Sequence, residues 1–152
     1  MKKKINVKLL KRICRAILHE PRRLDMYGWI YDDDIHHMGC DAPCGTAACI
    51  GGFAVILSRT RLLANKSWKK AVKSCLTEKP AEYLFGYEFM DEVIACEAQK
   101  LLNLTSAQAE RLFVSSNWPE KFHIGYSDAT HKKQAKVTVA RIKHFTETNG
   151  EE

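Results

Sequence analysis

The chain has 152 residues, of which 45% are hydrophobic and 28% are charged, and it carries a formal net charge of +6. This balance is typical of a soluble globular domain and excludes an intrinsically disordered chain. The most apolar stretch, residues 47–57, has about half of the roughly 20 residues that a membrane-spanning helix needs, so we expect no membrane span. The lysines at positions 2–4 are not followed by an apolar segment of the kind found in signal peptides, so we expect a cytoplasmic protein.

The first predicted element is an amphipathic helix over residues 5–18, where apolar side chains recur at helical spacing with basic residues between them. Pro21 ends this pattern. Residues 21–45 follow as a loop-rich segment, in which an aromatic turn precedes an exposed acidic loop.

Residues 46–58 are predicted to form a buried central helix, because almost every position is apolar. Gly51 and Gly52 lower its helix propensity and indicate that another part of the backbone approaches closely there. Cys44 would lie at the N-terminus of this helix, where unpaired backbone N–H groups stabilise a thiolate.

Four further helices are predicted. Trp68 anchors a short one over residues 67–76, and an apolar face favours another over residues 88–102. Thr105 and Gln108 have the spacing of a capping box, which begins the next helix of about nine residues. The last helix begins near Asp128 and stops at 149–150, and residues 149–152 are expected to be a flexible end. Its outer face is predicted to be a basic binding surface formed by Lys132, Lys133, Lys136, Arg141 and Lys143.

No stretch shows the alternation of a half-buried strand. We therefore predict an all-α fold for residues 1–152, a single compact domain of about five or six helices around the helix over residues 46–58. The six cysteines of a chain without secretion signals are expected to be thiols, with no disulfide among residues 40, 44 and 49.

Three kinds of chemistry are open to this sequence, and the first is a cysteine-dependent hydrolase or transferase. Cys44 would be the nucleophile and His123, after the turn at residues 118–119, would be its base. The sequence offers no third group that would orient the histidine.

The second is a zinc site made of His36, His37, Cys40 and Cys44, which have ligand chemistry at short spacing. The pattern lacks a Cys-x-x-Cys pair, and the acidic residues beside the histidines are equally typical of a solvated loop. We therefore expect no metal and no other cofactor.

The third is a basic nucleic-acid-binding module. Lysines and arginines lie on the first helix, on residues 59–73 with Trp68, and on the last helix, so they could contact phosphates. A base-reading element is not evident, because the helix over residues 106–114 offers only Arg111 as a base-reading cation.

A resemblance runs over roughly residues 18–145. The chain has Asp25-Met26 with Trp29, then Cys44-Gly45-Thr46-x-x-Cys49-Ile50-x-Gly52, a segment of the form Leu-x-Leu-Thr-x-x-Gln-Ala-x-x-Leu-Phe, and Trp118-Pro119. In this order the motifs resemble a family of small uncharacterised proteins of bacteria and their phages. The resemblance implies a mobile-element or host-interaction context and carries over no catalytic residue. We therefore expect a non-enzymatic helical interaction protein, a phage-type accessory or inhibitor that binds a host protein.

Overall fold

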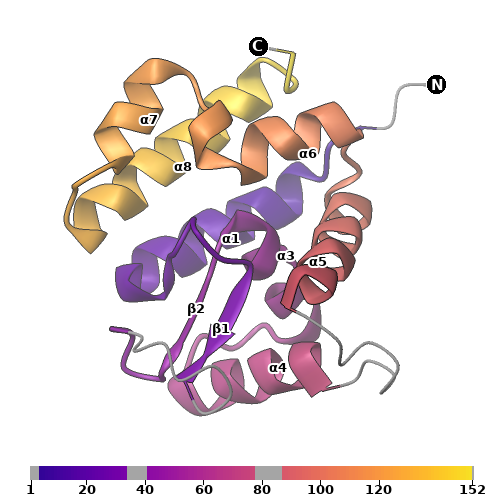
Figure 1. Ribbon diagram of the computed structural model, residues 1–152, viewed down its shortest axis with the longest axis vertical. Coiled ribbons are helices and arrows are strands. Elements are labelled where there is room, and N and C mark those ends of the chain that lie inside the picture. Colours follow the sequence, from indigo (N-terminus) through magenta and orange to yellow (C-terminus); the bar gives the residue numbers. More distant parts are fainter. Residues whose placement is uncertain (1–3, 34–40, 78–86, 152) are drawn as a thin grey trace.

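The computed structural model describes residues 4–33, 41–77 and 87–151. These residues form seven α-helices and one two-stranded sheet (Figure 1). The mostly helical content confirms the all-α expectation in its coarse form, although the described part of the chain already has more helices than expected. In chain order the elements are α1 (Val7–His19), the 3-10 turn η1 (Pro21–Arg23), β1 (Ile30–Asp32), β2 (Thr46–Ala48), α3 (Ile50–Arg59), α4 (Asn65–Thr77), α5 (Tyr87–Leu102), α6 (Ser106–Phe113), the 3-10 turn η3 (Ser115–Asn117), α7 (Glu120–Tyr126) and α8 (His131–Glu147).

Helix α3 is the centre of the fold. Its residues 50–57 are all buried, and α1, α4, α5 and α6 pack around it (Figure 1). The predicted burial of this segment is confirmed, since Cys49, Phe53 and Ile56, spaced along one face, are each no more than 3% exposed. The helix does not begin at residue 46, however, because Cys49 is its N-cap and the three residues 46–48 are a strand.

The strands that the sequence did not reveal form a short antiparallel sheet. Ile30 pairs with Ala48 and Asp32 with Thr46. All three residues of β2 are buried, so both of its faces are covered and the alternation that normally indicates a strand is missing. The sheet places β1 within the segment 21–45 that was expected to be loop, and η1 lies in the same segment.

The close approach predicted at the paired glycines is confirmed. A Cβ atom on Gly52 would overlap the backbone carbonyl oxygen of Trp29, and one on Gly51 would press on the Trp29 ring. The backbone of the residue before β1 therefore lies directly against α3, which only glycine permits.

The C-terminal half agrees more closely with the elements that were predicted from the sequence. Thr105 and Gln108 form the predicted capping box at α6, with both reciprocal hydrogen bonds present. The predicted last helix begins three residues later than Asp128, at His131, because Asp128 has a left-handed backbone conformation with φ of 55°. The seven-residue helix α7 was not predicted. No helix of the described residues combines the length and the apolar character that crossing a membrane requires.

Residues 149 and 150, in the segment expected to be a flexible end, make hydrogen bonds to α6 and α8. The Gly150 N–H donates to the Phe145 carbonyl oxygen at 2.8 Å, and the Gly150 carbonyl accepts from Arg111 Nη1 at 2.8 Å. Gln108 Nε2 also donates to the Asn149 carbonyl at 2.8 Å. Left-handed conformations at Asn149 and Gly150 end α8 and turn the chain back onto α6, as is common where glycine follows a helix.

Candidate functional site

A large share of the positive charge of the fold lies on two helices from opposite ends of the chain. Helices α1 and α8 together hold nine of the 24 lysines and arginines but only one of the 18 acidic residues, Glu147. The rest of the chain therefore has more acidic than basic residues, although the whole protein is basic. Together α1 and α8 carry a net charge of +8, and α4, with four lysines and no acidic residue, carries a further +4.

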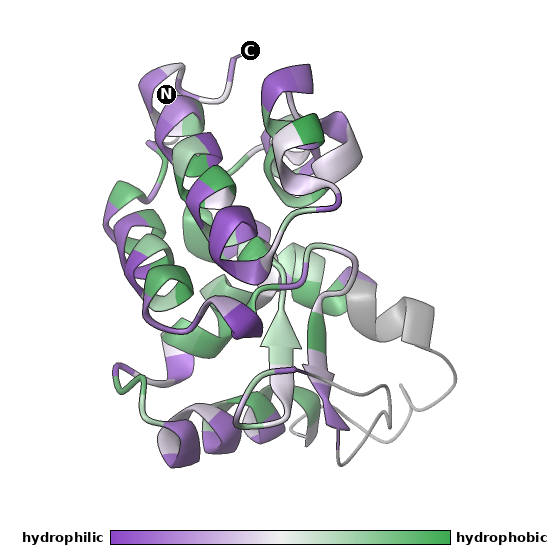
Figure 2. Ribbon diagram, turned by 90° about the vertical axis from the view of Figure 1, so that its left-hand side faces the viewer, coloured by the Kyte–Doolittle hydropathy of each residue, from purple (hydrophilic) through white to green (hydrophobic). Residues whose placement is uncertain are grey.

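Helices α1 and α8 pack against each other, and Figure 2 views the side of the molecule on which they lie next to one another. Cys14 on α1 lies near Lys143 on α8, where the two helices meet. Burial raises the pKa of the Cys14 thiol, and the Lys143 ammonium group partly opposes this rise. The charged faces of the two helices are thus neighbours.

We call the exposed basic residues of these helices the basic surface. It consists of Lys8, Lys11 and Arg15 from α1 and of Lys132, Lys133, Lys136 and Lys143 from α8. Their spacing follows from helix geometry, since residues three or four apart share a face. On α1, Leu9, Leu10, Ile13 and Ile17 turn toward the core and leave the basic residues in solvent.

Arg141 does not belong to the basic surface, contrary to the sequence prediction. Its side chain is fully buried, and its Nη2 donates to the Arg111 carbonyl oxygen at 2.9 Å. Arg141 lies three residues after Thr138 and four before Phe145, both of which face the core, so helical spacing places it on the inner face. The guanidinium group joins the end of α6 to α8.

The Arg12 side chain is also engaged in hydrogen bonds within the protein. Its Nη2 donates to the carbonyl oxygens of Leu57 at 2.8 Å and Thr60 at 3.1 Å, which caps the C-terminal end of α3. The cations left at the basic surface are therefore mainly lysines, with Arg15 as the one arginine.

Cys44 has a different environment from the one predicted. It precedes β2, is 7% exposed, and its Sγ lies 3.0 Å from the Thr46 hydroxyl oxygen. Cys49 instead occupies the helix N-terminus, where its Sγ accepts from the Gly52 N–H at 3.5 Å. The helix N-terminus predicted for Cys44 is therefore occupied by Cys49.

The structure does not bring Cys44 and His123 together. Cys44 shares a cavity of about 420 Å³ with residues of α4, which lies at the lower end of the molecule in Figure 1, whereas His123 is on α7 at the upper end. His123 Nδ1 lies 3.1 Å from the Ser115 carbonyl oxygen and thereby joins α7 to the turn before it.

Of the proposed zinc ligands, His36, His37 and Cys40 lie outside the described residues. The described residues 4–33, 41–77 and 87–151 contain no group of three or more potential metal ligands. Cys44 is thus the one member of the set whose surroundings are known.

The residues proposed to read nucleic acid are mostly engaged elsewhere. Arg111 donates to the Gly150 carbonyl, as described above, and is half-buried. Trp68 is fully buried, with the Arg23 guanidinium 4.7 Å above its ring and the Phe53 ring centroid 5.1 Å away. This indole is therefore unavailable for stacking on bases.

Comparison of the chain with protein-family models, with curated proteins and with solved structures finds no match in any of the three.

Proposed function

We propose that the protein is a non-enzymatic helical interaction protein that binds an acidic surface of another protein through the basic surface on α1 and α8. The observation that carries this proposal is the segregation of charge, since two packed helices expose seven basic side chains and a single acidic one, Glu147. Like charges placed side by side repel one another, so such a surface is stabilised by a partner of opposite sign.

A protein partner suits this surface better than a nucleic acid. Arginine is the residue that reads guanine and grips phosphate through two parallel hydrogen bonds, but Arg12 and Arg141 are turned inward here. Leu18, which is 51% exposed, lies one helical turn from Arg15 and offers an apolar contact beside the charges. Protein interfaces combine apolar contacts with a charged rim in this way.

The family resemblance in the sequence adds a biological setting to this proposal. It favours a phage or mobile-element accessory or inhibitor whose acidic target is a host protein. A cysteine-dependent enzyme has less support, because Cys44 is buried and the histidine proposed as its base is on a distant helix.

The proposal is tested by reversing charges on the basic surface. The variant Lys11→Glu/Lys136→Glu/Lys143→Glu removes three exposed cations that span both helices, and its affinity for a fluorescent polyglutamate peptide is measured by anisotropy at low salt. Each exposed charge contact contributes about 0.2–1 kcal/mol, and reversal replaces attraction by repulsion, so we expect the affinity to fall at least about tenfold.

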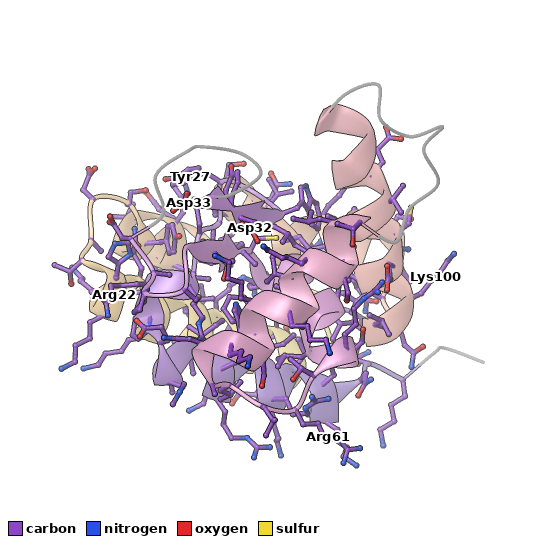
Figure 3. All side chains as sticks on the ribbon, turned by 90° about the horizontal axis from the view of Figure 1, so that it is seen from below. Arg22, Tyr27, Asp32, Asp33, Arg61 and Lys100 are labelled. Carbon is purple, nitrogen blue, oxygen red and sulfur yellow. The ribbon has the colours of Figure 1, made fainter. Side chains whose placement is uncertain are left out.

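A matched control separates the basic surface from net charge alone. Lys66→Glu/Lys70→Glu/Lys100→Glu makes the same change in net charge at exposed lysines of α4 and α5, and Lys100 is labelled in Figure 3. This control is expected to bind polyglutamate nearly as the parent does. Equal losses in the two triple variants would contradict the proposal. Tighter binding of a DNA duplex of matched charge at every salt concentration would favour a nucleic-acid partner instead.

A further inference from the structure

A second candidate site is a cavity of about 290 Å³ beside the sheet. It lies between the turn that follows η1, the two strands and the first turn of α8. Its floor is made of buried residues, Leu24, Ala47 and Tyr126. This cavity is separate from the basic surface and uses none of its lysines.

Besides the tyrosines, the ionisable side chains that line the cavity are Arg22, Asp25, Asp41 and His131. The positive charge of Arg22, which also lines it, is balanced by Glu20, whose Oε1 is 3.1 Å from Arg22 Nε. Asp41 Oδ2 lies 3.1 Å from Nε2 of His131, which leaves the Asp25 carboxylate as the candidate partner of a cation in the cavity.

Two tyrosine rings complete the cavity. Tyr27 is 74% exposed although it is aromatic, and Figure 3 shows it on the same side of the molecule as Arg22. Its N–H donates to Asp25 Oδ1 at 2.8 Å, and its ring centroid lies 6.3 Å from that of the buried Tyr126. The Tyr31 ring lies directly against Gly28, where a Cβ atom would overlap it. The aromatic groups are thus positioned next to the carboxylates by contacts of their own.

We propose that this cavity binds a planar organic cation, the guanidinium group of arginine. A guanidinium group donates two parallel hydrogen bonds to a carboxylate and stacks on the face of an aromatic ring. Asp25 and the Tyr27 ring provide these two partners. The volume is sufficient for one side chain and too small for a folded segment.

The test is a titration of the full-length protein with argininamide, followed through the amide NMR signals of residues 24–31. The matched ligand is citrullinamide, which replaces the guanidinium group by an uncharged urea of the same shape. We expect argininamide to bind at least about tenfold more tightly, because a hydrogen bond to a charged group contributes more than a neutral one. Equal affinity for the two ligands would overturn the proposal.

Protein variants locate the binding. Asp25→Asn keeps an oxygen that accepts from the Tyr27 N–H but removes the charge, and it is expected to weaken argininamide binding about tenfold. Tyr27→Ala should weaken it similarly, while Tyr27→Phe retains the ring and most of the affinity. Asp128→Asn is the control, since this exposed aspartate does not line the cavity. Unchanged affinity in both Asp25→Asn and Tyr27→Ala would overturn the assignment.

A blocked Gly-Arg-Gly peptide identifies the source of the cation. Binding of the peptide at least as tight as that of argininamide assigns the cavity to an arginine side chain of a polypeptide. Weaker binding of the peptide assigns it to a free guanidinium compound. The basic surface is untouched by these variants, so failure here leaves the proposed function unaffected.

Discussion

At the scale of single residues, the difference between Cys44 and Cys49 decides what chemistry the cysteine-rich motif can do. Cys44 was expected at the helix start and Cys49 inside the helix, because residues 46–58 are apolar at almost every position. A left-handed turn at Gly45, with φ of 64°, and pairing of residues 46–48 with β1 move the helix start to Cys49. This pairing joins residues about sixteen positions apart, so no local pattern around Cys44 reveals it.

The burial of these cysteines predicts an order of alkylation. Cys44 is 7% and Cys49 is 3% exposed, whereas Cys96 on α5 is exposed. Among the described cysteines, we expect iodoacetamide to modify Cys96 first and Cys44 and Cys49 only after unfolding. Peptide mapping by mass spectrometry checks this order. Rapid modification of Cys44 in the native protein would revive the cysteine-enzyme alternative.

At the scale of elements, helical periodicity located the helices that present one apolar face, and capping residues located the start of α6. Helix α7 was missed because seven residues are too few to establish a period, and the strands were missed because β2 is buried on both faces. The glycine pair in α3 was the one local signal of the tertiary contact with the residue before β1.

That contact predicts a large difference between two glycine substitutions. Gly52→Ala would force its new methyl group onto the Trp29 carbonyl oxygen, which is backbone and cannot rotate away. We expect it to lower the free energy of unfolding by about 1–3 kcal/mol or more, as overpacking does. Chemical denaturation monitored by circular dichroism measures this loss.

Gly125→Ala is the matched control for that substitution. Gly125 also lies in a helix, α7, but a Cβ atom there would meet only Val137 side-chain atoms, at 3.4 Å and beyond. Because alanine has the higher helix propensity, we expect this variant to be as stable as the parent or slightly more stable. Equal destabilisation by both substitutions would mean that α3 does not lie against the Trp29 backbone.

At the scale of the whole molecule, the basic surface depends on a pairing of the first and last helices. Sequence alone identified the basic residues on each helix, but it could not place residues 8–15 beside residues 132–143, because that proximity is created by tertiary packing. It also placed Arg141 outside, since a buried arginine has no signature other than its position on the helix. The sequence therefore predicted most of the basic residues of the candidate site, but not that two helices combine them into one surface.

The most direct test of the central claim is to locate polyglutamate binding on the folded protein by amide NMR shifts. We expect the shifts to concentrate in residues 7–19 and 131–147, which form α1 and α8. They should also weaken as salt is added, because the contacts are exposed charges. Shifts centred on α4 and the sheet, or spread evenly over the protein, would contradict the claim that α1 and α8 form the binding surface.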